Sequence, residues 1–598
     1  MRPIAPLVLL TLAGVAQSAP PTRLIALDGD TTQRTDGSVV TIARSADVSV
    51  GAGGDMYFSA LAPGSPFVGD AIFVPGAEAG LRAFRSVLTT GEEAPGGSGF
   101  GFRPEVILQI PDAGEFGYPL STRTSINASG DFVALHLLDG SPFSTFFNSI
   151  GLWRPDGDAL RNTAISEIIN GNLIVSPTQH VLVDDGRAFW SRFVPAGVAG
   201  AETGSALFVE ENGVAGIAIG PGDPAPGTGD VFQSIVVADI TPGGALAFRA
   251  RLANLETPLP AIGNDGVWAG PLDDLRLVAR EGDTAPVTGD PIYQSFSERV
   301  RTNNAGDVLF DASLSTGPGA SVRGLMRERG GVLEAVVLQG DAAPGVPGAV
   351  FAGPDSTDTF VAHIGGGGDA LLIASITGPG VDDTNDTGLW VVTDDEIELL
   401  AREGAPAPGA SGTVFASFRG DPGPTQAGFL PARNNDSNYA FLAALRPGVG
   451  GVVEGVNDLG LWAYDPVAGG LALLARTGDD VDLLGDATDV RTIAGISFNP
   501  IYGLADNGYI AYTLDFGSGS TGVFGALLPT EKRAVCPGDN DDDGDVDLGD
   551  FGAFAMAFST ALGDADYDPA FDFDYDGDVD LGDFGAFGAS FGRTDCPD

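Results

Sequence analysis

Short apolar runs, each ended by Gly, Pro or Asp, follow one another along most of the chain. One pattern returns eight times between about residues 20 and 530: three variable residues, Gly, two more residues, a small residue and an aromatic one, as in Asn303-Asn-Ala-Gly-Asp-Val-Leu-Phe310. Its period of about 65 residues, with a turn leading into a strand, predicts a β blade or repeat unit rather than a helical repeat. The residues at the glycine position are Gly54, Gly130, Gly186, Gly244, Gly306, Gly368, Ser437 and Gly508.

Two more strands follow each copy of this pattern. One begins Gly-Leu-Trp or a variant, as in Gly388-Leu-Trp390, and the other ends in a Gly-acid-x-Ala-Pro turn, as in Leu277–Pro286. A Gly-x-x-Phe step such as Gly412–Phe415 then leads into the next copy. The total is about four strands per repeat, as in a propeller blade.

The recurring side chains of these elements favour structural roles over ligand sites. We expect the Trp to pack between blades rather than to serve as a sugar platform. Regular recurrence of an acid in the Ala-Pro turn indicates capping of nearby backbone N–H groups. The acids concerned are Asp223, Asp283, Asp341 and, in a variant turn, Glu92.

The start of the repeat region resembles the end of a repeat. Arg23-Leu-Ile-Ala-Leu-Asp-Gly-Asp30 matches Leu277–Asp283, whereas the eighth repeat lacks such a strand before Pro529. Closing a ring with this strand would remove exposed sheet edges. The fold class predicted for residues 19–530 is therefore all-β: an eight-bladed β-propeller closed by the N-terminal strand. Seven blades is the alternative count, and a string of β-sandwiches is the alternative architecture.

The repeat pattern resembles a family of secreted bacterial tandem-repeat proteins defined by an NxxGxxAF motif. The resemblance covers most of residues 20–530, although Gly365 replaces the Asn of one copy and Ser437 the Gly of another. It implies an architecture and no activity.

Composition narrows the classes of partner. The chain has 80 acidic and 30 basic residues, for a net charge of −50. Such a surface repels phosphate backbones and anionic lipids, so we expect no nucleic-acid partner and no binding to membrane surfaces. A hydrophobic content of 43% argues against disorder.

Residues 1–18 have the features of a secretory signal peptide: Arg2, an apolar run from Ile4 to Val15, and a small-x-small end at Ala16-Gln17-Ser18. A membrane anchor is the alternative, but the run is short for a bilayer span. We expect an exported mature protein, extracellular or attached to a cell surface, without a transmembrane segment.

The repeat region offers no motif of a known catalytic centre. Its three histidines, His136, His180 and His363, lie apart in sequence and lack the spacing of zinc ligands. We find no nucleophile elbow and no phosphate-binding loop. A pair of glycosidase carboxylates among so many acids is not identifiable from sequence.

The C-terminal end carries the clearest chemistry. Residues 543–554, Asp-Gly-Asp-Val-Asp-Leu-Gly-Asp-Phe-Gly-Ala-Phe, recur as residues 576–587. Each copy completes a loop with carboxylates at positions 1, 3, 5 and 12, an Asp at position 7 that offers its backbone carbonyl, and Gly at position 6, the arrangement of a calcium loop. We predict two calcium ions, one held by Asp539, Asp541, Asp543, Asp545 and Asp550, the other by Asp572, Asp574, Asp576, Asp578 and Asp583. Asp547 and Asp580, at position 9, are expected to act through a water.

Cys536 and Cys596 flank the two loops and are the only cysteines. In an exported protein they predict one disulfide that ties the ends of residues 536–598 together. Residues 531–535 are the expected linker. An apolar stripe at i, i+3, i+7 follows each loop and predicts two helices that pack face to face: Phe551, Phe554, Phe558 and Phe584, Phe587, Phe591.

Asp at position 12, where an ordinary EF-hand has Glu, and two loops each followed by a helix resemble the dockerin pattern over nearly all of residues 536–598. The resemblance implies calcium-dependent docking onto a cohesin-like partner or another extracellular scaffold or surface protein. Positions 10 and 11 are Leu-Gly in both loops, where dockerins often carry Ser or Thr, which leaves the partner open. An acidic solubilising tail is the alternative.

Together these features predict a secreted, non-catalytic binding protein with a calcium-dependent dockerin-like anchor, and a glycan is one candidate ligand for its propeller. Two alternatives stay open. The first is a dockerin-borne carbohydrate-active enzyme for polysaccharide degradation, and the second is a self-associating extracellular structural protein.

Overall fold

The computed structural model describes residues 22–27, 31–33, 39–41, 44–50, 56–61, 69–74, 85–89, 101–102, 124–126, 132–139, 150–156, 159–165, 167–169, 172–174, 178–194, 204–253, 263–352, 360–393, 396–418, 432–434, 438–465, 470–483, 488–499, 503–505, 508–517, 519–529, 536–539, 545–561, 569–573, 578–594 and 596. The expected signal peptide and the linker lie outside these residues.

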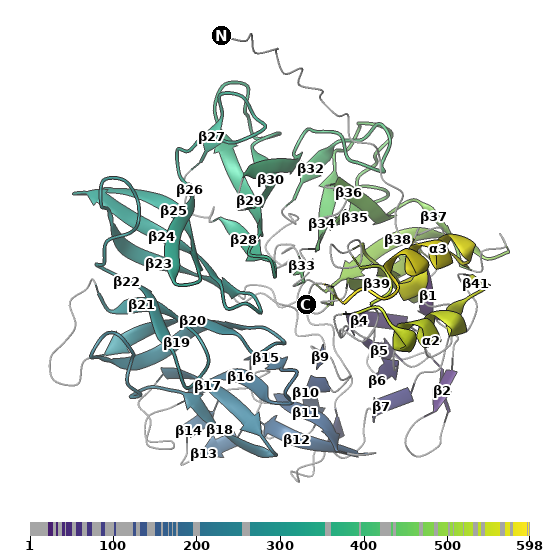
Figure 1. The fold of residues 1–598 in the computed structure, drawn as a ribbon, viewed down its shortest axis with the longest axis horizontal. Helices are drawn as coiled ribbons and strands as arrows, with labels where there is room; N and C mark the ends of the chain where they lie inside the picture. The colour runs from purple at the N-terminus through teal and green to yellow at the C-terminus, as the bar shows by residue number, and fades with distance from the viewer. Residues whose placement is uncertain are drawn as a thin grey trace.

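The described part of the repeat region forms a β-propeller, as predicted. Eight of its sheets have four to six strands, and Figure 1 shows them arranged around a common centre. Within most blades, consecutive strands pair antiparallel in chain order. The first three blades comprise β2 (Thr31–Gln33), β3 (Val39–Thr41), β4 (Arg44–Val50), β5 (Met56–Leu61), β6 (Gly69–Val74) and β7 (Arg85–Thr89); β8 (Gly101–Phe102), β9 (Thr124–Ile126), β10 (Phe132–Asp139), β11 (Ile150–Asp156) and β12 (Ala159–Ile165); and β15 (Thr178–Leu182), β16 (Ala188–Val194), β17 (Gly204–Glu211) and β18 (Val214–Ile219).

The next four blades keep the same order, except that the first strand of two of them is split into two short pieces. They comprise β19 (Val231–Ile240), β20 (Leu246–Ala253), β21 (Asp265–Ala269) and β22 (Arg276–Arg280); β23 (Ile292–Thr302), β24 (Val308–Gly317), β25 (Ala320–Arg329) and β26 (Val332–Leu338); β27 (Val350–Phe351), β28 (Val361–Ile364), β29 (Ala370–Thr377), β30 (Thr387–Val392) and β31 (Ile397–Arg402); and β32 (Phe415–Ser417), β33 (Ala432–Arg433), β34 (Tyr439–Leu445), β35 (Leu459–Asp465) and β36 (Gly470–Arg476). A separate hairpin pairs β13 (Glu167–Ile169) with β14 (Asn172–Ile174).

The last blade joins the two ends of the repeat region. Its strands from the C-terminal end are β37 (Asp480–Asp482), β38 (Val490–Phe498), β39 (Tyr509–Phe516) and β40 (Ser520–Leu527), and its final strand is β1 (Thr22–Leu27). β1 pairs antiparallel with β40, with Thr22 opposite Ala526 and Leu27 opposite Gly522. The Tyr512 hydroxyl also donates to Thr22 Oγ1 at 3.2 Å. The predicted closure by the N-terminal strand is confirmed.

The repeated glycine lies in the turn that joins the first two strands of a blade. Gly306, between β23 and β24, has φ 79°, and its N–H donates to the Asn303 carbonyl at 3.0 Å. Gly186, Gly244, Gly368 and Gly508 also have positive φ and make the corresponding bond. Glycine is favoured there because it tolerates this backbone region. Gly54, Gly130 and Ser437 lie outside the described residues.

The Asn that opens the pattern links neighbouring blades. Asn303 Nδ2 donates to the carbonyl of Gly365, in the turn of the next blade, at 2.8 Å, while its Oδ1 accepts from the Asp307 N–H. Asn434 Nδ2 donates to the Ala505 carbonyl in the same way, at 3.0 Å. Both asparagines are buried, so each bond satisfies polar groups that burial would otherwise penalise.

The Trp of the Gly-x-Trp strand is fully buried and joins three repeat elements. Trp390 donates from Nε1 to the carbonyl of Pro344, in the Ala-Pro turn between two blades, at 3.0 Å. Its ring packs edge-on against Phe351 of the Gly-x-x-Phe step, with centroids 5.0 Å apart. Trp268 and Trp462 make the equivalent bonds to Pro226 and Pro408. The expected packing role is therefore confirmed for Trp268, Trp390 and Trp462.

The acids of the Ala-Pro turn also behave as expected where the structure gives their contacts. Asp223 Oδ2 accepts from the Gly220 N–H, and Asp341 Oδ2 accepts from the Leu338 N–H, both at 2.8 Å. Such bonds to nearby backbone N–H groups hold a turn in shape. Glu92 lies outside the described residues.

Replacing Gly388 with Ala tests why glycine precedes this Trp. A Cβ at residue 388 would lie 2.5 Å from the Trp390 ring, which is fully buried. We expect Gly388→Ala to lower the free energy of unfolding by about 1–3 kcal/mol, measured by chemical denaturation. Gly216→Ala in β18 is the matched control, because nothing lies within 4 Å of a Cβ there. Equal stability of the two variants would contradict this account.

Candidate metal centre

The C-terminal residues form a small module with two helices of ten residues, α2 (Leu548–Ala557) and α3 (Leu581–Ser590). Figure 1 shows them side by side near the blade that closes the ring. Among the described residues, no helix is long and apolar enough to cross a membrane.

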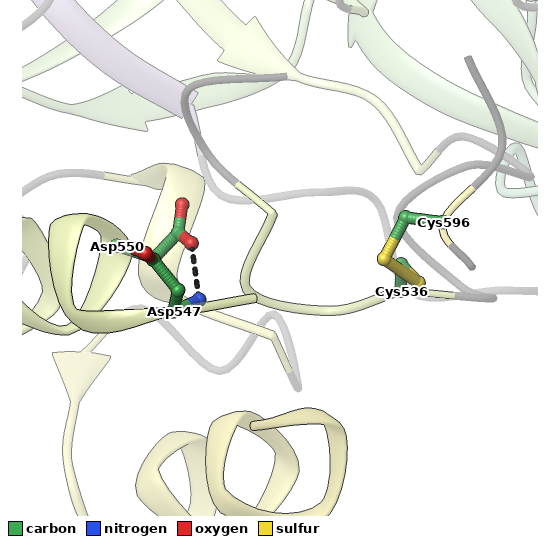
Figure 2. Close-up of a disulfide and its surroundings, with 4 residues drawn as sticks. All are labelled: Cys536, Asp547, Asp550 and Cys596. Atoms are coloured by element: carbon green, nitrogen blue, oxygen red, sulfur yellow. Dashed lines mark hydrogen bonds between the residues drawn. A yellow bond between two sulfur atoms is a disulfide. The ribbon is translucent and has the colours of Figure 1, made fainter. Parts of the chain in front are cut away.

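Each helix begins at a pair of aspartates that form a capping box. Asp547 Oδ1 accepts from the Gly549 N–H at 2.6 Å, and Asp550 Oδ2 accepts from the Asp547 N–H at 2.9 Å (Figure 2). Asp580 and Asp583 repeat both bonds in α3. Carboxylates at this end satisfy free N–H groups and interact favourably with the helix dipole. Position 9 therefore serves as the N-cap in both halves of the module.

Carboxylates from positions 7, 9 and 12 of each loop lie close together beside the capping box. In the first loop, oxygen atoms of Asp545, Asp547 and Asp550 all lie within 4.8 Å of one another. Asp578, Asp580 and Asp583 form the same group in the second loop. Sequence reasoning placed position 12 among the carboxylate ligands and position 7 among the ligands through its backbone carbonyl. It missed the capping role of position 9, which the Asp-x-x-Asp spacing signals.

The ends of both loops are buried. Asp550 and Asp583, at position 12, are 2% and 0% exposed, and Asp539 and Asp572, at position 1, are 9% and 2% exposed. Asp583 Oδ1 also accepts from the Phe573 N–H, at 2.6 Å, which ties position 12 to the start of its loop. Burying several carboxylates together is costly unless cations or hydrogen bonds compensate.

The module has few basic residues that could compensate these buried carboxylates. Residues 536–598 contain 18 Asp and one basic residue, Arg593. An all-carboxylate donor set suits a hard cation such as Ca²⁺ or Mg²⁺. The described ligands therefore fit the predicted metal. The remaining predicted ligands, Asp541, Asp543, Asp574 and Asp576, lie outside the described residues.

A stack of two phenylalanines joins the helices. Phe554 and Phe587 are each 1% exposed, and their ring centroids lie 5.0 Å apart with an interplanar angle of 22°. We expected three Phe from each helix to pack in this core. Of those six rings, only Phe554 and Phe587 are buried. The flanking rings keep 37–47% of their surface exposed: Phe551, Phe558, Phe584 and Phe591.

Backbone pairing relates the two halves of the module by an approximate twofold. After α2, the Ser559 N–H donates to the Val579 carbonyl, and after α3 the Gly592 N–H donates to the Val546 carbonyl, both at 2.7 Å. β41 (Thr560–Ala561) also pairs with β42 (Asp578–Val579). Since Val546 and Val579 each occupy position 8, every loop is braced by the segment that follows the other helix.

The predicted disulfide is confirmed. Cys536 and Cys596 are bonded, with Cα atoms 5.7 Å apart (Figure 2). Both cysteines belong to the buried cluster that contains Phe554 and Phe587. The bond therefore holds the two ends of the module against its aromatic core.

The propeller carries one strongly perturbed carboxyl among its described residues. Burial raises the pKa of Asp311 to about 6, although Arg323 and Arg299 act to lower it. Asp311 pairs with Arg323 at 2.7 Å, and Arg249 pairs with Asp265 at the corresponding place in the preceding blade with the charges exchanged. A pair that recurs with reversed sign between strands is a structural ion pair rather than the two facing carboxyls that a glycosidase requires.

The chain belongs to the DUF7453 family, a family of unknown function, whose model matches residues 12–357 and 354–528. No curated protein matches the chain. Solved structures to which it is similar include the β-propeller domain of the Trilobed protease from Pyrococcus furiosus, at 8% identity over 73% of this chain and 99% of that one, with a TM-score of 0.33. The Dos1 propeller has 10% identity over 86% and 95% of the two chains, with a TM-score of 0.33. Polysaccharide lyase Uly1 has 9% identity over 72% and 97%, with a TM-score of 0.35.

The aromatic core predicts how the module responds to truncation of its rings. Phe587→Ala removes a ring that is packed on all sides, which costs about 3–5 kcal/mol for a buried Phe and is comparable with the whole stability expected of so small a module. We expect faster proteolysis between residues 536 and 598 in the full-length protein, read by mass spectrometry. Phe591→Ala, which removes a half-exposed ring at the C-cap of the same helix, is the control and should leave the cleavage rate close to that of the wild type.

Proposed function

We propose that this protein is an exported, non-catalytic binding protein attached to an extracellular scaffold or cell surface through its C-terminal module, in a calcium-dependent way. The observation that carries the proposal is the buried pair Asp550 and Asp583, each at the head of a helix and each gathered with two more carboxylates. The same arrangement occurs twice at equivalent positions, which an acidic solubilising tail would not require.

The chain's own residues define what each site does. Asp539, Asp545 and Asp550 of the first loop, and Asp572, Asp578 and Asp583 of the second, are the described residues that would hold an ion. When bound, calcium supplies the positive charge that lets these carboxylates lie close together. The capping boxes use one oxygen of Asp550 and Asp583 to start the helices, so loop closure and helix formation depend on the same side chains.

The exposed rings give the module a surface that a partner would cover. Phe551, Phe558, Phe584 and Phe591 flank the buried Phe554–Phe587 stack, and Leu548 and Leu581 are 74% exposed. Exposed apolar patches of this kind mark protein interaction sites. Because the two halves are nearly identical, a partner can engage the module in two orientations. A cohesin-like protein is the partner class that the dockerin resemblance implies.

Calcium stoichiometry tests the sites directly. We expect the full-length protein to bind two calcium ions in isothermal titration calorimetry. Asp583→Asn should weaken one of the two by at least about tenfold, since it removes a charge but keeps an oxygen that can accept the Asp580 N–H. Asp550→Asn should do the same to the other site. Glu454→Gln, at an exposed propeller position, should still bind two ions; an unchanged titration in both Asp variants would reject the sites.

Cell-surface retention tests the anchoring role. Labelled full-length protein should bind cells of the source organism in calcium and be released by a chelator. The double variant Asp550→Asn/Asp583→Asn should not be retained, while Glu454→Gln should be. Retention that does not depend on calcium would contradict the proposal. A glycan array followed by sugar-release assays addresses the propeller: turnover that a single carboxylate substitution abolishes would favour the carbohydrate-active enzyme instead.

A further inference from the structure

The C-terminal module shares a buried contact with the propeller. The short 3-10 helix η2 (Pro569–Phe571) lies between the two calcium loops in sequence and contacts β40. Ala570 is 9% exposed and belongs to a hydrophobic cluster of the propeller rather than to the core of its own module. The other members of that cluster are Ala26, Val48, Val50, Met56, Phe58, Ala505, Tyr509, Ala511, Val523 and Leu527.

This cluster lies at the place where the ring closes. It takes residues from β1, β39 and β40 of the last blade and from β4 and β5 of the first. We call this contact between the first and last blades the seam. It is tightly packed, since a Cβ on Gly525 of β40 would come within 2.9 Å of Met56 Cε of β5. Figure 1 shows the module over this part of the ring.

Consecutive residues of η2 belong to different cores. Ala570 packs into the propeller seam, whereas Phe571 is 1% exposed in the module core and meets the Phe554 ring edge-on at 5.7 Å. Asp572, the first predicted ligand of the second loop, follows directly. Any change that loosens the aromatic core or the second loop therefore acts on the residue that touches the seam.

We infer that the C-terminal module is a clamp on the propeller's ring closure, in addition to any external docking. Through Ala570, it covers the seam between the first and last blades and resists separation of β1 and β4 from β39 and β40. The partner of this module surface is thus the chain's own propeller. The helix faces that carry Phe551, Phe558, Phe584 and Phe591 stay exposed, so the clamp leaves them available to a second protein.

Hydrogen exchange of the full-length protein, read by mass spectrometry, tests the clamp. Ala570→Asp places a charge in the apolar seam, and we expect the amides of β1 and β4 to exchange at least about tenfold faster, while β23 and β24 on another part of the ring keep their wild-type rates. Ala589→Asp is the matched control, because Ala589 is exposed on α3 of the same module. Wild-type exchange in β1 and β4 of Ala570→Asp would overturn the inference.

Two further arms keep the test decisive. If Ala570→Asp does not accumulate as folded protein, Ala570→Ser gives the same comparison with a smaller polar group, and Cys536→Ser/Cys596→Ser loosens the module without touching the seam. Both should speed exchange in β1 more than in β23, and equal rates in the two strands would overturn the clamp.

A calcium chelator separates the clamp from the proposed function. With both correct, chelation speeds exchange in β1 of the wild type and adds little in Ala570→Asp. Faster exchange in Ala570→Asp with no response to the chelator supports the clamp and counts against the calcium sites.

Discussion

The antiparallel pairing of β1 with β40 is the contact on which the propeller depends. Without it, β40 would present a row of unpaired N–H and C=O groups, and the last blade would lack its fourth long strand. The pairing also fixes which faces meet at the seam, since Ala26 of β1 and Val523 and Leu527 of β40 enter one hydrophobic cluster with strands of the first blade. The other blades are formed by neighbouring stretches of chain, so their strands pair locally. Among the blades formed by the described strands, this one alone is assembled from both ends of the repeat region.

Electrostatic repulsion between its acids, rather than the amount of apolar surface it buries, limits the stability of the C-terminal module. Its aromatic core is small, and its acids are concentrated where the helices begin. The Asp residues at the N-cap and at the third helical position stabilise each helix. Both side chains accept hydrogen bonds from backbone N–H groups that a helix otherwise leaves unsatisfied. One carboxylate oxygen from each of positions 7, 9 and 12 also lies within 4.8 Å of the other two, which explains why these residues are the candidates for a cation.

The sequence predicted the features that recur or match internally. Arg23–Asp30 was identifiable as a closing strand because it resembles Leu277–Asp283, and the structural role of Trp390 followed from its regular spacing. Contacts across blades had no such signal: the bond from Asn303 to Gly365 joins residues far apart in the chain, and Ala570 is an ordinary residue in a segment without a pattern. Helical periodicity places Phe551 and Phe554 on one face of the helix. It does not say how deeply each side chain is buried, so it could not show that Phe554 is buried and Phe551 half exposed. Positions 1, 7 and 12 of each loop were predicted by spacing, whereas the N-cap role of Asp547 and Asp580 required the geometry of the helix start.

Closure across the whole repeat region has a consequence for biogenesis. Thr22 and Tyr512, which share a hydrogen bond at the closure, are 490 positions apart, so β1 must wait until nearly the whole repeat region has been made before it finds its partner. Until then the growing chain carries an unpaired first strand and an incomplete terminal blade, both of which favour aggregation. A chain that stops before β40 has no partner for β1 and cannot complete the ring. The fold thus distinguishes full-length from truncated products, and a chaperone that shields β1 would protect the strand whose partner is made last.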